Sequence, residues 1–281
     1  MKATQPILLM IPHFLSSRLA CIGMRNFGGL LVSLTLFIVI DASGEPFPLP
    51  TSTPLTNVTF VAFDTETTGL SAETGFLLEI AAVRFRLDGV LARQCWLINP
   101  GVPIPEAARR VNNITDAMVS NSPPVATVLP QFVHFAEGSV LLAHNARFDR
   151  GFVATEANRH SLALPTGPLF DSLPLFKTWF PGPRSYNLEA LTTSLLPGFT
   201  NQVPPVAIDG RTNQFHTALW DSECLAALFV RGTTNLPPKA TLADLLRVSR
   251  GAYSFRNPKR LWRPSGNAQS SSEAAPDELA P

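Results

Sequence analysis

This sequence has few cysteines and almost no net charge, and each of these two features argues against a class of protein. Its three cysteines, Cys21, Cys95 and Cys224, are widely spaced and odd in number, which argues against a disulfide framework and against a cysteine-based zinc site. The formal net charge is only +1, so no global electrostatic field marks the chain as a nucleic-acid binder. Any binding of nucleic acid must therefore come from local patches.

A charge-free stretch lies near the N-terminus. Residues 27–40 are apolar or small, and the proline-rich stretch 45–54 follows them. A run of this length fits the hydrophobic region of a signal peptide better than a membrane-spanning helix. Two other interpretations stay open, a short anchor before a proline-rich linker and an upstream extension included by a misplaced start codon. Our prediction is a cytoplasmic location, with export or membrane anchoring through residues 27–40 as the alternative.

The middle of the chain has the pattern of a mixed α/β domain. We predict an N-terminal extension over residues 1–56 and a folded domain over residues 57–232. Residues 58–63 form a continuous apolar run typical of a buried strand. A mixed sheet flanked by helices, an antiparallel meander followed by parallel strands, is the predicted fold. The other predicted strands are 77–86 and 90–98, joined in a hairpin at Asp88-Gly89, then 139–143 and a further short one at 168–170. The long helices are 125–137, 147–159, 188–195 and 217–230.

Basic and aromatic residues alternate in the C-terminal part of the chain, which we treat as an extension over residues 233–281. Residues 242–248 predict a short helix, and arginines then alternate with Tyr253, Phe255 and Trp262. Such a stretch can follow a phosphate backbone and stack on bases. The alternative, which we favour slightly, is a solvated strap along the domain surface. Residues 265–281 are polar and rich in Ser, Ala and Pro, a composition typical of disorder.

Two acids end the first predicted strand, in the sequence VAFDTETTGL at residues 61–70. Alternate side chains of a strand share a face, so Asp64 and Glu66 are expected to project together, about 7 Å apart along the strand. A buried or half-buried pair of like charges is costly unless a cation neutralises it, and Mg²⁺ or Mn²⁺ bound by carboxylates is the usual solution. The alternative is that the two acids only begin a turn at the end of a strand.

Two later segments add candidate residues. Asp149 lies in the first turn of a predicted helix, where the helix dipole favours an acid. Asp221 falls on the apolar stripe of the helix predicted at 217–230, and acids are seldom buried there without a partner. His216 precedes that helix, whose N-terminus disfavours the imidazolium form and leaves a neutral ring able to accept a proton near pH 7. Acids from three segments and a neutral histidine are the parts of a two-metal hydrolase.

These motifs, in this order, resemble the DEDDh 3′–5′ exonucleases of the ribonuclease H-like superfamily, which the proofreading (epsilon) subunit of bacterial DNA polymerase III typifies. The resemblance covers about residues 58–230, and three motifs in order are far more specific than any one of them. It implies a ribonuclease H-like fold and metal-assisted hydrolysis of a phosphodiester bond. The motifs that carry it are FDTETTGL with Asp64 and Glu66, HNARFD with Asp149, and HTALWD with His216 and Asp221.

The resemblance also implies a role for each site residue. Asp64, Glu66 and Asp221 would hold one of two divalent ions, Mg²⁺ or Mn²⁺; Asp64 would be shared with the second ion, and Asp149 would support it. His216 would deprotonate the attacking water, and a nucleoside 5′-monophosphate would be released. The expected substrate-binding residues are Thr65, Thr68, Leu70, His144 and Asn145.

Our leading interpretation is a 3′–5′ exonuclease that acts on single-stranded or frayed DNA ends in proofreading or repair, with a DNA polymerase as a conceivable partner. An RNA-trimming exonuclease would use the same motifs, because contacts to the 2′-hydroxyl are not readable from the sequence. A catalytically silent nucleic-acid-binding or polymerase-accessory module would often have lost a catalytic residue. The five expected here are all present: Asp64, Glu66, Asp149, Asp221 and His216. An exported or membrane-tethered nuclease is favoured only by residues 27–40.

Overall fold

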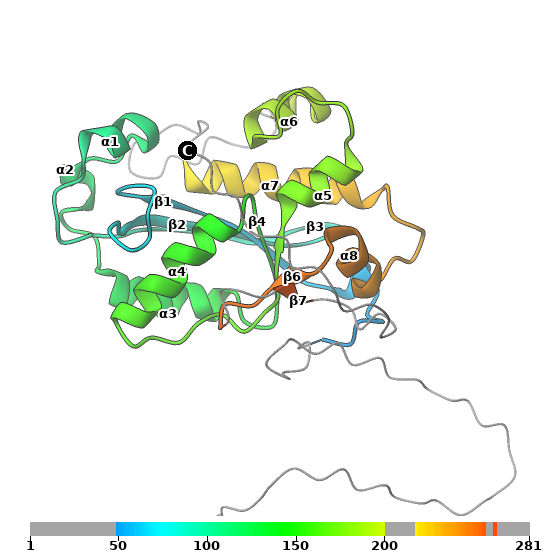
Figure 1. The fold of residues 1–281 in the computed structure, drawn as a ribbon, viewed down its shortest axis with the longest axis horizontal. Coiled ribbons are helices and arrows are strands. Elements are labelled where there is room, and N and C mark those ends of the chain that lie inside the picture. The colour runs from blue at the N-terminus through cyan, green and yellow to red at the C-terminus, as the bar shows by residue number, and fades with distance from the viewer. Residues whose placement is uncertain (1–48, 200–216, 257–260, 263–281) are drawn as a thin grey trace, which may run out of the picture. The chain divides into compact units, whose positions relative to one another are not determined.

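Strands from the beginning and the end of the folded region meet in one sheet. The computed structural model describes residues 49–199, 217–256 and, by their backbone, 261–262. Among these residues the strand order is β3-β2-β1-β4-β5-β6-β7 (Figure 1). The strands are β1 (Phe60–Thr67), β2 (Leu77–Arg86), β3 (Gly89–Leu97), β4 (Val140–Ala143), β5 (Leu169–Asp171), β6 (Ala252–Tyr253) and β7 (Leu261–Trp262).

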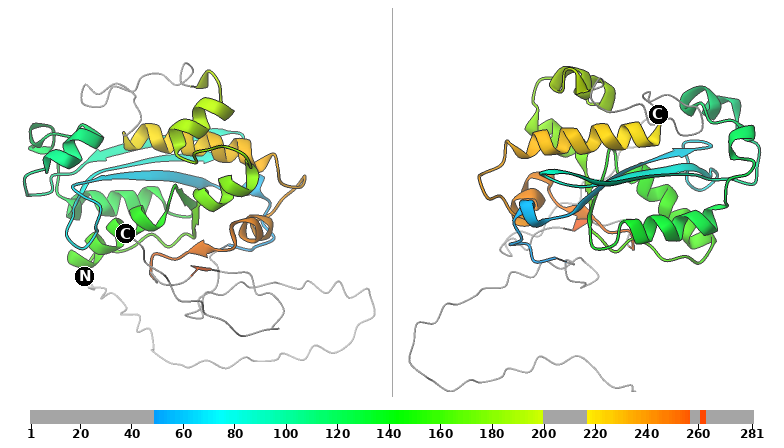
Figure 2. Two further views of the ribbon diagram at one scale, coloured as in Figure 1. Left: turned by 45° about the horizontal axis from the view of Figure 1, so that its top comes forward. Right: turned by 180° about the vertical axis from the view of Figure 1, so that it is seen from behind.

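The sheet is mixed, and helices cover both of its faces. β1 is antiparallel to β2 and parallel to β4, β2 is antiparallel to β3, and β4 is parallel to β5. The predicted meander followed by parallel strands is therefore confirmed. α5, α6 and α7 lie on one face, and α3 and α4 on the other (Figure 2). The helices are α1 (Glu106–Asn112), α2 (Asp116–Val119), α3 (Val125–Phe135), α4 (Arg147–Arg159), α5 (Ser172–Trp179), α6 (Leu188–Leu195), α7 (Ala218–Thr233) and α8 (Leu242–Ser249).

The side chains of β1 alternate between two hydrophobic clusters. Phe60 and Ala62 belong to the cluster under α7, whereas Val61 and Phe63 belong to the cluster under α3 and α4. All four side chains are fully buried, which explains why the strand is apolar throughout instead of alternating. The same alternation places Asp64 on the α7 face of the sheet, because residues two apart in a strand share a face.

The packed core extends beyond residue 232 and begins before residue 57, the two limits that we predicted. The leucines of α8 are fully buried in the cluster that also contains Leu55. The Leu55 amide donates to the Ala240 carbonyl over 2.9 Å, and Pro54 forms a β-bridge with Thr241. These contacts join distant parts of the chain, which local sequence patterns do not reveal. The predicted short helix at 242–248 is present as α8.

The aromatic residues of the C-terminal stretch do not form one surface. Phe255 is 2% exposed, and its ring centroid lies 6.3 Å from that of Phe63. Phe255 is therefore a core residue and is not available to stack on a base, in contrast to one of our two interpretations of this stretch. Tyr253 is half-buried and pairs with Leu169 of β5. The tail predicted to be disordered, 265–281, lies outside the described residues.

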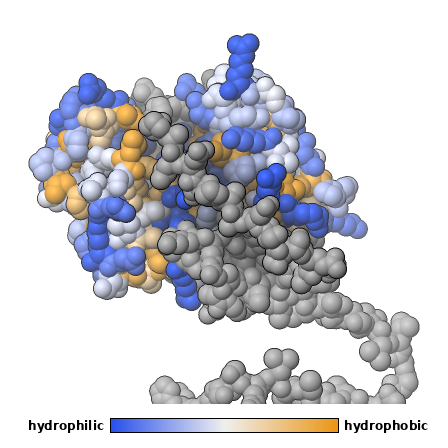
Figure 3. Space-filling view, in the orientation of Figure 1, coloured by the Kyte–Doolittle hydropathy of each residue, from blue (hydrophilic) through white to orange (hydrophobic). Residues whose placement is uncertain are grey.

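The surface of the described residues mixes hydrophilic and apolar side chains. On the face drawn in Figure 3, apolar patches lie between hydrophilic ones on either side of the grey atoms. The membrane hypothesis rested on residues 27–40, which lie outside the described residues. Within the part of the chain that the structure describes, no helix combines the length and the apolar character needed to cross a bilayer.

Candidate active site

A cavity of about 440 Å³ opens where β1 ends. Its lining comes from the end of β1 and the loop after it, from α1, from the turn between β4 and α4, and from the first turns of α4 and α7. Nine of the ten predicted site residues line this cavity: Asp64, Thr65, Glu66, Thr68, Leu70, His144, Asn145, Asp149 and Asp221. The tenth, His216, lies outside the described residues; it directly precedes Thr217, the N-cap of α7.

Three carboxylates converge in this cavity. Asp64 and Glu66 project from the same face of β1, and Asp221 comes from the first turn of α7, which packs on that face. One oxygen from each carboxylate can be chosen so that all three lie within 4.8 Å of one another. A set of oxygen donors without sulfur or imidazole matches a hard divalent cation such as Mg²⁺ or Mn²⁺. The donor chemistry therefore fits the predicted metal site.

The pKa of Asp64 shows what this convergence costs. Burial raises that pKa well above its usual value, and the neighbouring charges of Asp149, Asp221, Glu66 and Glu79 raise it further. Both effects penalise the ionised carboxylate, because the site removes water and gathers like charges. A bound cation reverses the penalty by supplying the opposite charge.

Asp149 approaches the site from the other face of the sheet. It lies in the first turn of α4 and is 2% exposed. Burial raises its pKa to about 7, and a hydrogen bond from Thr65 opposes that rise. The Thr65 hydroxyl donates to Asp149 Oδ1 over 2.8 Å. Thr65 on β1 therefore fixes the orientation of the Asp149 carboxylate.

The side chains expected to contact substrate differ in exposure and in the hydrogen bonds that they already form within the protein. Thr65 and Thr68 are 5% and 8% exposed. The Thr65 hydroxyl is engaged with Asp149, and the Thr68 hydroxyl accepts a hydrogen bond from the Phe76 amide over 2.9 Å. These hydroxyls thus hold the carboxylate and the loop after β1, while Leu70 at the mouth is 90% exposed.

His144 and Asn145 occupy a tight turn between β4 and α4. Asn145 has a left-handed backbone with φ of 61°, and its backbone N–H donates to Asp171 Oδ1 over 3.0 Å. Asp171 also caps α5 through the Leu173 amide, so it joins two elements at this edge. His144 Nδ1 lies 2.8 Å from Ser172 Oγ, and burial lowers the pKa of the imidazole. A neutral His144 ring is thus held at the cavity wall.

One residue of the site had no predicted role. Glu79 on β2 is 1% exposed and lies directly opposite Glu66 in the strand register. The Cys95 thiol donates to Glu79 Oε1 over 2.8 Å. The signal that could have identified it is an acid inside the apolar run LLEIAAV, which needs a partner or a function. Only the register shows that this acid lies beside the carboxylate cluster.

Known proteins resemble the chain in the region that builds this site. It is 40% identical over 185 residues to a DNA polymerase III subunit epsilon-like protein of Rhodobacter capsulatus, a match that covers 64% of this chain and 24% of the relative. It is 32% identical over 195 residues to a PolC-type DNA polymerase III of Streptococcus pneumoniae, with coverage of 69% and 12%. The chain thus spans a quarter or less of the length of these relatives.

Solved structures agree in fold. Exonuclease X in complex with 5′ overhanging duplex DNA matches with a TM-score of 0.50 and 26% identity, covering 68% of this chain and 99% of that one. Exonuclease I of E. coli in complex with an oligonucleotide matches with a TM-score of 0.52 and 18% identity, covering 63% and 41%. The predicted ribonuclease H-like fold is confirmed. Residues 61–229, more than half of the chain, match the Exonuclease family, and the chain belongs to that family.

Proposed function

We propose that this protein is a metal-dependent 3′–5′ exonuclease that hydrolyses the terminal phosphodiester bond at 3′ ends of DNA and releases nucleoside 5′-monophosphates. The observation that carries the proposal is the convergence of Asp64, Glu66 and Asp221 within 4.8 Å. The proposed setting is proofreading or repair, with single-stranded or frayed ends as substrate and a DNA polymerase as partner. The epsilon-like and PolC-type relatives support this setting.

We infer that the site binds two divalent ions, Mg²⁺ or Mn²⁺. Asp64, Glu66 and Asp221 would hold the first, and Asp64 and Asp149 the second. Bound there, such ions would supply an acidified water and stabilise charge on the scissile phosphate. The raised pKa values of Asp64 and Asp149 support this assignment, because both carboxylates lie where their ionised forms need a compensating cation.

The protein groups around the carboxylates would position substrate and move the proton. Thr65 holds Asp149 in place, and His144, held by Ser172, presents a neutral ring that can hydrogen-bond the sugar or the phosphate. His216, which directly precedes the N-cap of α7 in the sequence, would accept the proton of the attacking water, because a helix N-terminus disfavours an imidazolium beside it. Leu70 at the mouth would pack against the terminal base.

Release of mononucleotides from 3′-labelled single-stranded DNA tests this function. With Mg²⁺ or Mn²⁺ the protein should release them one at a time, and Asp64→Asn should lower the rate by about a thousandfold or more, since several kcal/mol of charge stabilisation are lost. Asp88→Asn is the matched control. Asp88 lies in the hairpin turn between β2 and β3 and does not line the candidate active site, and the resulting Asn-Gly sequence is compatible with that turn.

The same assay on RNA decides the substrate class. A faster reaction on DNA supports our proposal, whereas a faster reaction on RNA would assign the site to RNA trimming. If the metal-loaded protein released no mononucleotide from either polymer, the enzymatic proposal would be wrong.

A further inference from the structure

The loop between β1 and β2, residues 68–76, forms one rim of the candidate active site, and we call it the rim loop. Thr68, Gly69 and Leu70 line the cavity. Hydrogen bonds close the base of the loop: the Thr68 backbone N–H donates to the Phe76 carbonyl over 2.9 Å, and the Phe76 N–H donates to the Thr68 hydroxyl over 2.9 Å. The position of Leu70 therefore depends on what holds the outer part of the loop.

The outer part of the rim loop rests on α4, the helix that carries Asp149. A Cβ atom added to Gly75 would lie 3.0 Å from the ring of Phe152, so the loop backbone packs directly on this ring. Ala72 lies beside Gly151, because a Cβ atom added to Gly151 would be 3.8 Å from the Cβ of Ala72. The rim loop and Asp149 thus share one support.

Arg159, the last residue of α4, binds the backbone of this outer part. Its Nη2 donates to the carbonyls of Ala72 and Glu73 over 3.1 and 2.6 Å, and its Nη1 donates to the carbonyl of Gly75 over 2.8 Å. The guanidinium also lies over the Phe76 ring, 4.9 Å from its centroid. A planar group with five N–H donors can reach several carbonyls at once, so one side chain holds the loop at three positions.

A buried acid fixes the guanidinium from the helix. Glu156 is 1% exposed, and its Oε1 accepts a hydrogen bond from Arg159 Nη1 over 2.8 Å. Its Oε2 lies 3.5 Å from His160 Nε2. Neither Glu156 nor Arg159 lines the candidate active site, so metal binding does not explain why this acid is buried. Its contacts identify it as the counter-charge of the cation that holds the rim loop.

We propose that Arg159 is a positioning residue for the substrate. By holding the rim loop against α4 it fixes Leu70 at the mouth of the site, and so sets the affinity for the 3′-terminal nucleotide without touching it. Arg159 lies ten residues after Asp149 on α4, about 15 Å along the helix axis, so metal binding should not depend on it. The proposal rests on the proposed nuclease function, because it concerns the substrate of that reaction.

Arg159→Lys separates the anchoring of the loop from the pairing of charges. A lysine keeps a positive charge beside Glu156, so the fold should be retained, but its three donors lie on one nitrogen and cannot span the three carbonyls. For 3′-labelled single-stranded DNA, KM should rise about tenfold while kcat stays unchanged, because a displaced loop weakens binding and leaves the chemical step intact. Binding of Mn²⁺ should equal that of the wild type.

Arg84→Lys is the matched control. The Arg84 guanidinium also donates to backbone carbonyls, those of Phe135 and Glu137 over 3.0 and 3.4 Å, but neither of these residues lines the candidate active site. KM should therefore stay unchanged, and thermal melting shows whether each variant is folded. Equal KM values for the two variants, or a loss of kcat without a change in KM, would overturn the proposal.

A double-mutant cycle with Leu70→Ala shows whether Arg159 acts through the rim loop. Arg159→Lys should raise KM much less in the Leu70→Ala protein than in the wild type, because the side chain that it positions is gone. Effects of the two substitutions that multiply independently would overturn the proposal. A wild-type protein that hydrolyses neither DNA nor RNA would contradict the proposed function and this inference with it, whereas an active wild type with an unaltered KM in Arg159→Lys would contradict only the role of Arg159.

Discussion

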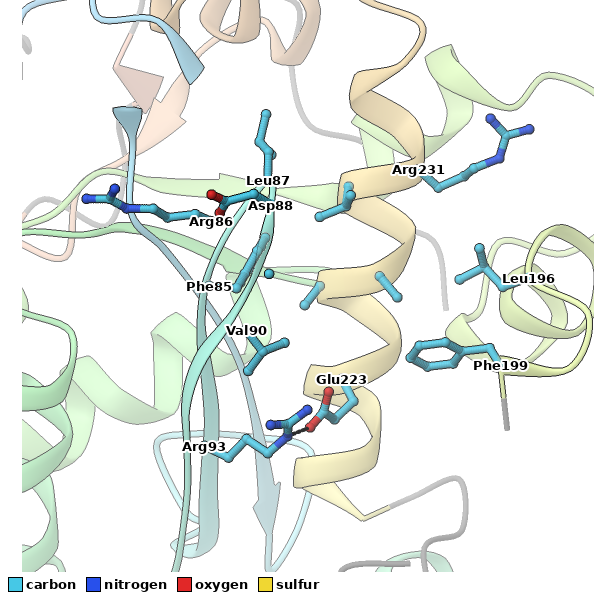
Figure 4. A pocket seen from close by; sticks show the side chains of 14 residues that line it. Phe85, Arg86, Leu87, Asp88, Val90, Arg93, Leu196, Phe199, Glu223 and Arg231 are labelled. Atoms are coloured by element: carbon cyan, nitrogen blue, oxygen red, sulfur yellow. Dashed lines mark hydrogen bonds and ion pairs between the residues drawn. The ribbon is translucent and has the colours of Figure 1, made fainter. Parts of the chain in front are cut away.

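The candidate active site and the α7 groove, the cavity between the β2–β3 hairpin, α7 and the segment after α6, have similar volumes, about 440 and 480 Å³ (Figure 4). The two cavities share one helix, but the acids that line them have opposite surroundings. In the groove, Glu223 is neutralised by Arg93. Two residues earlier on α7, Asp221 faces Asp64 and Glu66. A carboxylate with its own arginine is explained by structure alone, whereas a cluster of carboxylates that raises the pKa of Asp64 is explained by a cation from outside. The comparison thus separates an acid with a structural ion pair, Glu223, from the acid that we propose as a metal ligand, Asp221, on the same helix.

The largest effect should come from exchanging these two acids for their amides. Asp221→Asn should abolish metal-dependent hydrolysis, a loss of about a thousandfold or more, while the stability of the metal-free protein stays equal or rises because one like charge is gone. Glu223→Gln should keep the nuclease rate and lower the free energy of unfolding by about 1–2 kcal/mol, less than for a fully buried pair because Arg93 is half-exposed. Nuclease assays measure the rates of the two variants, and urea unfolding measures their stability. A rate loss for Glu223→Gln that exceeds the loss for Asp221→Asn would contradict the comparison.

The stability of the metal-free protein should depend on pH. Folding raises the pKa of Asp149 from the usual 3.8 to about 7 and raises that of Asp64 as well. The folded state therefore favours the protonated carboxyls, so this stability is present below pH about 4 and is lost as the pH rises toward about 7, by a few kcal/mol.

Thermal melting in EDTA and in Mn²⁺ checks this dependence. The gain in melting temperature from Mn²⁺ should be larger at pH 8 than at pH 5, because the ion competes with protons for the same oxygens. A metal-free melting temperature that stays level or rises between pH 5 and pH 8 would contradict the assigned pKa shifts.

A smaller effect is expected from the hydrogen bond that orients Asp149. Thr65→Val removes the donor, so the pKa of Asp149 should rise further and the acidic limb of the pH–rate profile should move to higher pH, with about a tenfold lower rate at neutral pH. Thr65→Ser restores the hydroxyl and should restore the profile. A loss of rate that is equal at every pH would indicate a purely structural role for Thr65.

The smallest effect should come from Leu70 at the mouth of the candidate active site. Leu70→Ala should raise KM for single-stranded DNA about fivefold, corresponding to on the order of 1 kcal/mol of lost apolar contact, and should leave the melting temperature unchanged because the side chain is 90% exposed. Leu91→Ala, at an exposed leucine of β3, is the matched control and should not change KM. An equal KM for the two variants would remove Leu70 from the substrate site.

The fold and the acidic cluster were predictable because their signals are local. The continuous apolar run before Asp64 identifies a strand buried on both faces, and the two-residue spacing to Glu66 places both acids on one side of it. Asp221 on a core-facing helical stripe was recognisable as an acid in need of a partner. Each inference needed only a few neighbouring residues, and the family resemblance then joined the three segments.

The features that the sequence did not reveal all depend on distant contacts. Glu79 faces Glu66 only through the register of β1 and β2, and Thr65 reaches Asp149 only because α4 packs on the opposite face of the sheet. Phe255 looked available for stacking on bases, yet the chain returns to pair with β5 and buries it. The α7 groove likewise requires a hairpin, a helix and the end of α6 to meet.

A titration with Mn²⁺ followed by electron paramagnetic resonance tests the central claim most directly, because free and protein-bound Mn²⁺ are counted without reference to activity. The wild-type protein should bind two Mn²⁺ ions. Asp64→Asn should lose both sites, since Asp64 is the proposed shared ligand, while Glu223→Gln should keep both. If Asp64→Asn bound as many ions with the same affinity as the wild type, the carboxylate cluster would not be the metal centre and the proposed two-metal mechanism would be wrong.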